Sequence, residues 1–207
     1  MVNVNGTVEI VAWDRNEISL EAEKSARTQE FLDRLQIVIE HSPAKLSVKT
    51  EVAKIWKFWE NSQASVRYKL MVPAGVSLDK IDVVNAAIVV RGVRGRVDLD
   101  TVNGSIEAEG LASGGRFDTV NGSIRAAFAR LRPDDEIVLD TVNGSCALTL
   151  PGDAAFTLTA DSVNGSISCD FPLTITKKSR SYLAGTVNGG GAKIVLDSVN
   201  GALRVKQ

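Results

Sequence analysis

Carboxylates recur at a fixed distance from asparagine along much of this 207-residue chain. Six aspartates each stand three residues before an asparagine, namely Asp82, Asp100, Asp118, Asp140, Asp161 and Asp197. If the repeated units stack in register, neighbouring carboxylates lie about 4.8 Å apart and repel by roughly 1 kcal/mol in bulk water, or about 3.5 kcal/mol at an effective dielectric of 20. Calcium takes about six to eight oxygen ligands in flexible geometry. The row is therefore a candidate calcium site, at Asp100, Asp118, Asp140 and Asp161.

A second interpretation of the aspartate row needs no metal. Each carboxylate accepts hydrogen bonds from backbone N–H groups or from Thr and Ser hydroxyls, while water screens the remaining charge. Gly185 interrupts the row, and the denser Gly and Asp spacing of calcium-binding nonapeptide repeats is absent. The pattern favours hydrogen bonding, and we expect no cofactor.

An Asn-Gly pair follows five of these aspartates, within the motif DTVNG or DSVNG. The pairs are Asn103-Gly104, Asn121-Gly122, Asn143-Gly144, Asn164-Gly165 and Asn200-Gly201. Both residue types tolerate a positive φ, so each pair predicts a sharp turn. A column of asparagines could bind a sugar, but stacked amides that hydrogen-bond to one another form structural ladders in other stacked sheets. We expect such a ladder, and it would fix the register of the units.

Short alternating runs flank each turn, which predicts two strands around a corner in every unit. The corner asparagines Asn85, Asn103, Asn121, Asn143, Asn164, Asn188 and Asn200 are spaced 18, 18, 22, 21, 24 and 12 residues apart, and a detached copy stands at Asn5. We interpret Asn5 as a detached rung, and expect distorted corners at Asn85 and Asn188, where VNAAI and VNGGG replace VNGSI.

Apolar residues recur at the same places in the unit, one and four residues before the asparagine and three residues after it. The units differ in length almost wholly in the segment that joins one unit to the next, and hardly at all around the Asn-Gly corner. Both features favour a β-solenoid of about seven VNG-corner coils, in which each coil buries its apolar face against its neighbours. An antiparallel meander of stacked hairpins is the alternative, because Asn-Gly also closes hairpins.

The first 75 residues carry a different pattern. Five strand-like runs surround TQEFLDRL, which places Phe31, Leu32 and Leu35 on one helical face. We expect residues 1–75 to form a β-rich cap on the repeats of residues 76–207, in one continuous unit, because an open solenoid end invites aggregation. Arg204 and Lys206 beside the last strand would protect the other end.

The order of four segments carries a resemblance. VNGTVEIVAWDRNEISLEAEK, YKLMVPAGVSL, VRGVRGRVDLDTVNGSIEAEG and LTLPGDAAFTLTADSVNGSIS together resemble the adhesin-like β-strand-repeat family of bacteria, a toastrack-like domain of unknown function. The resemblance spans the chain from Asn3 to Val205. It implies an exported repeat-built β fold, in the periplasm or at the cell surface, with relatives tied to envelope-stress sensing and no established catalytic residues. The first ten residues, MVNVNGTVEI, have neither the charged nor the apolar region that is typical of an export signal.

Composition excludes several classes of protein. The 24 basic and 25 acidic residues give a net charge of −1 with no basic stripe, so we expect no nucleic-acid partner. No apolar run reaches the 18 or so residues of a membrane helix.

Cys146 and Cys169 fall on inward positions of adjacent units, roughly 8 Å apart, and we expect free thiols. His41, the only histidine, lies in a turn sequence and is expected to be solvated.

The segment KIWKFWE holds two of the three tryptophans. Trp56, Phe58 and Trp59 either cover the solenoid end or, if exposed, contact a partner.

Two functions of different class follow. The first is a non-enzymatic, adhesin-like or envelope-associated scaffold that binds an unknown protein or a surface glycan. The alternative is a carbohydrate-active β-helix enzyme, which needs paired acidic groups in a groove, for example near the RPDDE loop. Glu107, Arg125 and Lys193 point outward but form no catalytic constellation. The first hypothesis is favoured.

Overall fold

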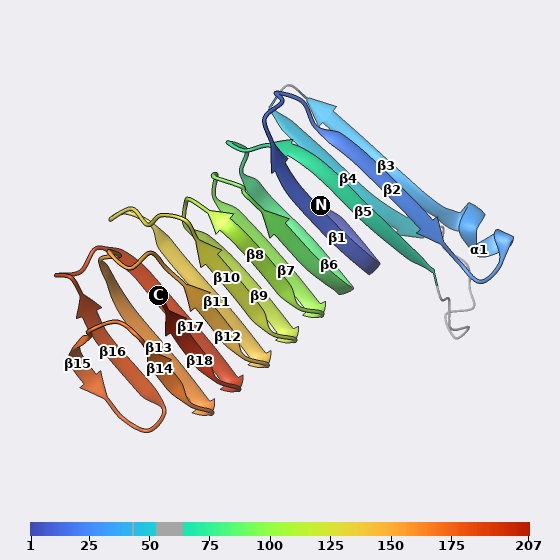
Figure 1. Cartoon of the computed structure of the whole chain (residues 1–207). Coiled ribbons are helices and arrows are strands. Elements are labelled where there is room, and N and C mark those ends of the chain that lie inside the picture. The colour runs from blue at the N-terminus through green and yellow to red at the C-terminus, as the bar shows by residue number, and fades with distance from the viewer. Residues whose placement is uncertain (43, 53–63) are drawn as a thin grey trace.

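The computed structural model describes residues 1–42, 44–52 and 64–207. In this part of the chain eighteen strands form one continuous sheet, with one short helix at the N-terminal end (Figure 1). The N-terminal elements are β1 (Val2–Trp13), β2 (Ser19–Ser25), α1 (Gln29–Arg34), β3 (Leu35–Ser42), β4 (Lys45–Val52) and β5 (Ser65–Pro73). The corner array comprises β6 (Leu78–Arg91), β7 (Val97–Asn103), β8 (Ile106–Leu111), β9 (Gly115–Asn121), β10 (Ile124–Phe128), β11 (Glu136–Asn143), β12 (Cys146–Thr149), β13 (Phe156–Asn164), β14 (Ile167–Cys169), β17 (Ala192–Asn200) and β18 (Leu203–Lys206). Between β14 and β17 in the sequence, β15 (Thr174–Lys178) and β16 (Tyr182–Val187) form a hairpin at the end of the stack, which we call the terminal hairpin.

Strands of successive coils pair in parallel. On the first wall β7 pairs with β9, and β9 with β11; on the second wall β8 pairs with β10, and β10 with β12. A meander of hairpins would place neighbouring strands antiparallel. The β-solenoid is therefore confirmed, and the meander is wrong for the corner array.

The coils do not stack in sequence order. The last coil, β17 and β18, lies between the coil of β11 and β12 and the coil of β13 and β14. Figure 1 shows this red coil between the yellow and orange ones. The terminal hairpin makes this order feasible, because β16 runs antiparallel along β13 and turns back before β17 begins.

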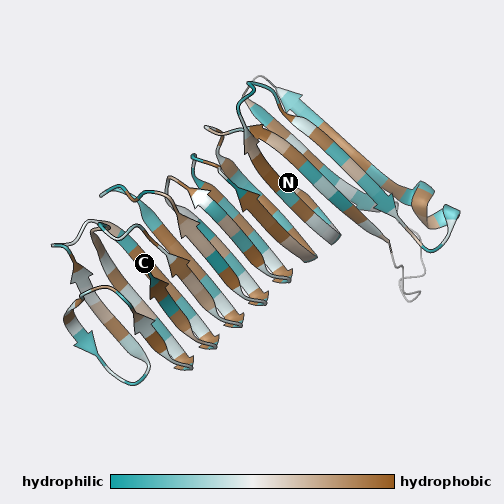
Figure 2. Ribbon diagram, in the orientation of Figure 1, coloured by the Kyte–Doolittle hydropathy of each residue, from teal (hydrophilic) through white to brown (hydrophobic). Residues whose placement is uncertain are grey.

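The interior is formed by the alternation of side chains along each strand (Figure 2). The residues four before each corner asparagine are fully buried, namely Leu99, Phe117, Leu139, Ala160 and Leu196. Ile106, Ile124, Cys146 and Leu203, three residues after the asparagine, are fully buried as well. Identical positions thus stack as apolar columns, as the repeat predicts.

The N-terminal strands continue the same sheet. β1 lies parallel between β5 and β6, with Asn5 opposite Asn85, so the detached rung is confirmed. β2 and β3 pair antiparallel with β5 and β4, and Thr28 caps the predicted helix. The division at residue 75 stays a prediction, since the sheet crosses it without a break. Within the described ranges, no helix has the length and apolar character needed to cross a membrane.

Candidate functional site

The corner asparagines form one hydrogen-bonded ladder along the whole stack. The Nδ2 of each donates to the Oδ1 of its neighbour, at 2.8 Å for Asn85 to Asn5, Asn103 to Asn85, Asn121 to Asn103 and Asn200 to Asn143, 2.9 Å for Asn143 to Asn121, and 3.0 Å for Asn164 to Asn200. Because each amide has its partner only when coils align, the ladder fixes register.

The two copies that depart from VNGSI, at Asn85 and Asn188, differ from one another. Asn85 joins the ladder while β6 runs unbroken through its corner. Asn188 leaves the stack, adopts a φ of 50° and donates to the carbonyl of Ala154. The seventh rung is therefore Asn5, and Asn188 belongs to the turn before β17.

The corner glycines are required for close approach, and the expectation of a positive φ is wrong. None of Gly104, Gly122, Gly144, Gly165 or Gly201 has a positive φ. A Cβ on Gly122 would lie 1.8 Å from the carbonyl oxygen of Gly104, and a Cβ on Gly201 would lie 1.7 Å from that of Gly144. Only a residue without a side chain lets one corner backbone rest on the next.

A second ladder lies on the inner side of the corners and was not predicted. Two residues before the asparagine, a buried Thr or Ser hydroxyl donates to a backbone carbonyl of the neighbouring coil. The pairs are Thr101 to Ala86 (3.0 Å), Thr119 to Gly104 (3.1 Å), Thr141 to Gly122 (3.0 Å), Ser198 to Gly144 (3.2 Å) and Ser162 to Gly201 (2.9 Å). The sequence carries the signal, since this position is Thr or Ser in all five DTVNG and DSVNG copies.

The aspartate row is continuous on the outer face of the first wall. Its order is Asp82, Asp100, Asp118, Asp140, Asp197 and Asp161, each in register with the next. Gly185 does not interrupt it, because Asn188 lies outside the stack. Partial burial raises the pKa of Asp197, and the neighbouring carboxylates raise it further. Burial also raises the pKa of Asp118, against the opposing effect of the Arg116 guanidinium.

Cations offset part of this repulsion. Arg116 Nε lies 2.7 Å from Asp118 Oδ2, and Lys80 Nζ lies 3.2 Å from Asp82 Oδ2. The Thr and Ser hydroxyls do not contribute, because they point inward to carbonyl oxygens, so that part of the hydrogen-bond interpretation is wrong. Among the described residues no group of three or more His, Cys, Asp or Glu side chains is placed to hold a metal ion.

Valine occupies the position before each corner asparagine, and these side chains are exposed. Along the stack they are Val84 (40%), Val102 (38%), Val120 (41%), Val142 (38%), Val199 (41%) and Val163 (66%). The repeat predicts that this apolar position is inward, and that prediction is wrong. The valines face outward because each lies one residue from the buried Thr or Ser. Figure 2 shows hydrophobic segments at the corners along one edge of the array. We call this valine column and the adjacent asparagine ladder the corner ridge.

Neither of two cavities in the described part of the chain is lined by a carboxylate. The larger, about 540 Å³, opens at the C-terminal end of the stack, and the smaller, about 340 Å³, lies on the variable edge between Arg94 and Arg130. In the RPDDE loop, Asp135 is buried and accepts hydrogen bonds from the backbone N–H groups of Gly114 and Arg132. Lys193 pairs with Glu136 at 2.8 Å.

The remaining candidate residues are placed as follows. Cys146 and Cys169 are free, as expected, although an intervening strand, β18, separates them. Burial raises the pKa of the Cys146 thiol to about 12. His41 is exposed as expected, but on strand β3 instead of in a turn. Trp56, Phe58 and Trp59 lie outside the described residues, so their role stays a prediction.

Comparisons with known proteins agree on the fold. A family model described as Toastrack DUF4097 matches residues 92–206, which is more than half of the chain. The search of curated proteins found no match. The crystal structure of a protein titled "putative cell adhesion protein" from Clostridium sporogenes ATCC 15579 superposes with a TM-score of 0.57 at 10% identity, covering 100% of this chain and 91% of that one. At this identity the likeness concerns the fold alone.

Proposed function

The chain belongs to the Toastrack DUF4097 family, and from that premise we propose that it is a non-enzymatic, adhesin-like scaffold that binds an extended protein or a surface glycan along its corner ridge. The proposed location is outside the cytoplasm, at the cell surface or in the periplasm. The observation that carries this proposal is the column of six valines, each 38–66% exposed, beside the asparagine ladder.

The ridge suits a partner that is itself extended. Exposed apolar side chains in a contiguous row mark interaction surfaces. The rungs repeat about every 4.8 Å, so a partner with repeated groups would make many weak contacts at once and gain affinity from their number. The two ladders hold the row rigid, and little ordering entropy would be lost on binding.

The family relationship and the fold of the Clostridium sporogenes protein support the adhesin-like class. The aspartate row lies on the outer face of the same wall, three residues from each ridge asparagine, and would favour partners that carry cations. No observation among the described residues favours the carbohydrate-active enzyme.

The experiment removes the apolar column without changing its shape. Threonine matches valine in size and β-branching, so V102T/V120T/V142T should fold normally. Binding is measured by biolayer interferometry against immobilised bacterial wall polysaccharides and extracellular-matrix proteins. We expect the triple variant to bind about tenfold more weakly than wild type, a loss of about 1.4 kcal/mol.

The matched control is I18T/I39T, which changes exposed apolar side chains away from the ridge, 44% and 50% exposed. This control should bind as wild type does. Equal binding by the triple variant, or no binding of any probe by wild type, would contradict the ridge as the binding surface. Release of reducing sugar ends from the polysaccharides would instead support the enzyme.

A further inference from the structure

The two walls of the solenoid end at different places. The first wall continues past β13 with β16 and then β15. The second wall ends at β14, whose described pairing is with β18 alone. The second wall is therefore shorter than the first by the two strands of the terminal hairpin, and among the described residues no strand pairs with the outer edge of β14. The expected protection of this end by Arg204 and Lys206 is wrong, because β18 lies inside the stack.

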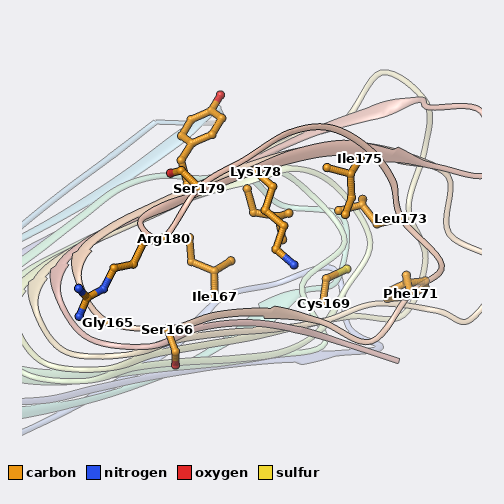
Figure 3. A pocket seen from close by; sticks show the side chains of 12 residues that line it. Gly165, Ser166, Ile167, Cys169, Phe171, Leu173, Ile175, Lys178, Ser179 and Arg180 are labelled. Atoms are coloured by element: carbon orange, nitrogen blue, oxygen red, sulfur yellow. The ribbon is translucent and has the colours of Figure 1, made fainter.

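The interior of the solenoid opens at this step as the 540 Å³ cavity. Ile167 and Cys169 on β14 line one side of it (Figure 3), and Leu183 on β16 also belongs to its lining. The interior-coil residues equivalent to Ile167, for example Ile124 and Leu203, are fully buried, whereas Ile167 is only partly buried. We call this cavity, with the open edge of β14, the end trough.

The backbone of β14 defines the shape of an occupant. Leu203 N donates to Ser166 O, and Asp170 N donates to Val205 O, so the even-numbered residues at the two ends of this strand bond to β18. In a strand, successive residues direct their N–H and C=O groups to opposite sides. The backbone groups of Ile167 and Cys169 therefore point away from β18, along the trough. A row of unpaired strand groups is a template for an added strand.

The charges at the trough define its chemistry. Figure 3 shows Lys178 extending toward the space above Cys169 and Arg180 extending toward the Gly165 corner. Both side chains are exposed, and neither forms an ion pair within the described residues. The trough lining contains no acidic residue. An occupant that carries carboxylates beside its apolar side chains would complement both the apolar lining and the two cations.

From these observations we propose that the end trough binds an extended peptide segment of a partner protein, in which apolar side chains alternate with acidic ones, as an added strand on β14. The apolar side chains would enter the open interior above Ile167 and Cys169, and the carboxylates would meet Lys178 and Arg180. The outer edge on the first wall is unlike this one, because every residue of β15 is exposed, so a strand added there would have no open interior to enter.

The test compares two synthetic nine-residue peptide libraries with the same apolar residues at alternate positions. The first has Asp or Glu at the intervening positions and the second has Lys. We expect the immobilised full chain to retain the acidic library and not the lysine library. The variant K178E/R180E should bind the acidic library at least about tenfold more weakly. Both replaced side chains are exposed, so the variant should fold.

A matched control and a footprint locate the binding. R204E/K206E makes the same change of charge on exposed residues of the neighbouring strand, outside the trough, and should bind as wild type does. Bound peptide should slow alkylation of Cys169, which lines the trough, while Cys146 stays unreactive with or without it.

The proposal is overturned if the two libraries bind equally, if K178E/R180E retains the acidic library as wild type does, or if Cys169 is not protected. An increase in mass with concentration in sedimentation, absent in K178E/R180E, would support the proposal and identify the strand donor as a second copy of the chain. The corner ridge is unchanged in both charge variants, so failure here is separate from failure of the proposed function.

Discussion

The corner array and the N-terminal strands share one sheet but hold their strands together in different ways. In the array, the five coils that follow β6 each turn at a glycine whose backbone rests on a carbonyl of the neighbouring coil, and the same polar contacts recur in all five. In the N-terminal part, β1, β2 and β5 run straight, and their polar contacts occur singly. The largest of these is a buried cluster in which Thr50 Oγ1 contacts Asn3 Oδ1 at 3.1 Å and Tyr68 Oη at 2.7 Å.

This difference separates two means of specifying register. A single buried cluster aligns strands only where it occurs, and each of its members has a distinct partner. A ladder aligns every coil with the same small set of residues, but it does not say which coil stacks on which. The sequence repetition thus specifies how residues of neighbouring coils align, but it does not specify the order in which the coils stack. The terminal hairpin determines that order.

The largest effect is expected from the corner glycines. In Gly122→Ala, the new Cβ would overlap the carbonyl oxygen of Gly104 at 1.8 Å, so the coils would have to separate. Overpacking of this kind costs about 3 kcal/mol or more, which urea unfolding would measure. Gly152→Ala is the control, because no atom lies within 4 Å of its Cβ. Similar stability of the two variants would mean that the corners do not stack closely.

The buried cluster of the N-terminal part should come next. Tyr68 is fully buried, and Thr50→Val removes the hydrogen-bond partner that its hydroxyl has among the described residues. We expect a loss of about 2 kcal/mol. Thr141→Val, in the array, removes a single bond to the carbonyl of Gly122 and should cost about 1 kcal/mol. Equal losses in urea unfolding would contradict the distinction between a cluster and a ladder.

Within the ladder, an inner rung should matter more than an end rung. Asn121→Ala removes two amide hydrogen bonds, to Asn103 and from Asn143, whereas Asn164→Ala removes one. Because the amides are exposed, we expect about 1 kcal/mol for the inner rung and about half of that for the end rung. Thermal unfolding of the two variants side by side would resolve the order, and a larger effect at Asn164 would contradict it.

Much of the fold could be predicted because the signal is local. Alternation identified the strands, and the repeat identified the buried columns at Leu99 and Ile106 and the amide ladder. The stacking order could not be predicted, because the five VNG corners have nearly identical edges and any of them can stack on any other. Asn188 has the corner dipeptide but lacks the aspartate three residues before it, where Gly185 stands. The role of the corner glycines was misjudged because φ is a property of one residue, whereas close approach depends on the neighbouring coil.

The smallest effect is expected from the aspartate row, and its sign depends on pH. Burial and the neighbouring Asp140 and Asp161 raise the pKa of Asp197 in the folded state above its ordinary value of 3.8. The folded state therefore binds more protons than the unfolded state between these two values, and stability decreases as the pH rises through that window. Asp197→Asn removes the ionised form, so it should stabilise the protein at pH 7 by well under about 1 kcal/mol, the scale of partly exposed charges.

Below the pKa that Asp197 has in the unfolded state, its carboxyl is protonated in both the folded and the unfolded state. The gain in stability from Asp197→Asn should then vanish. Thermal unfolding of wild type and variant between pH 3 and pH 7 would measure the gain. The same substitution at Asp118 is the comparison, because it also removes the ion pair with Arg116 and so should give a smaller gain or a loss. Destabilisation by Asp197→Asn at pH 7 would mean that the carboxylate makes a favourable contact with a cation. That result would restore calcium as the explanation for a row of aspartates that repeats with the coil.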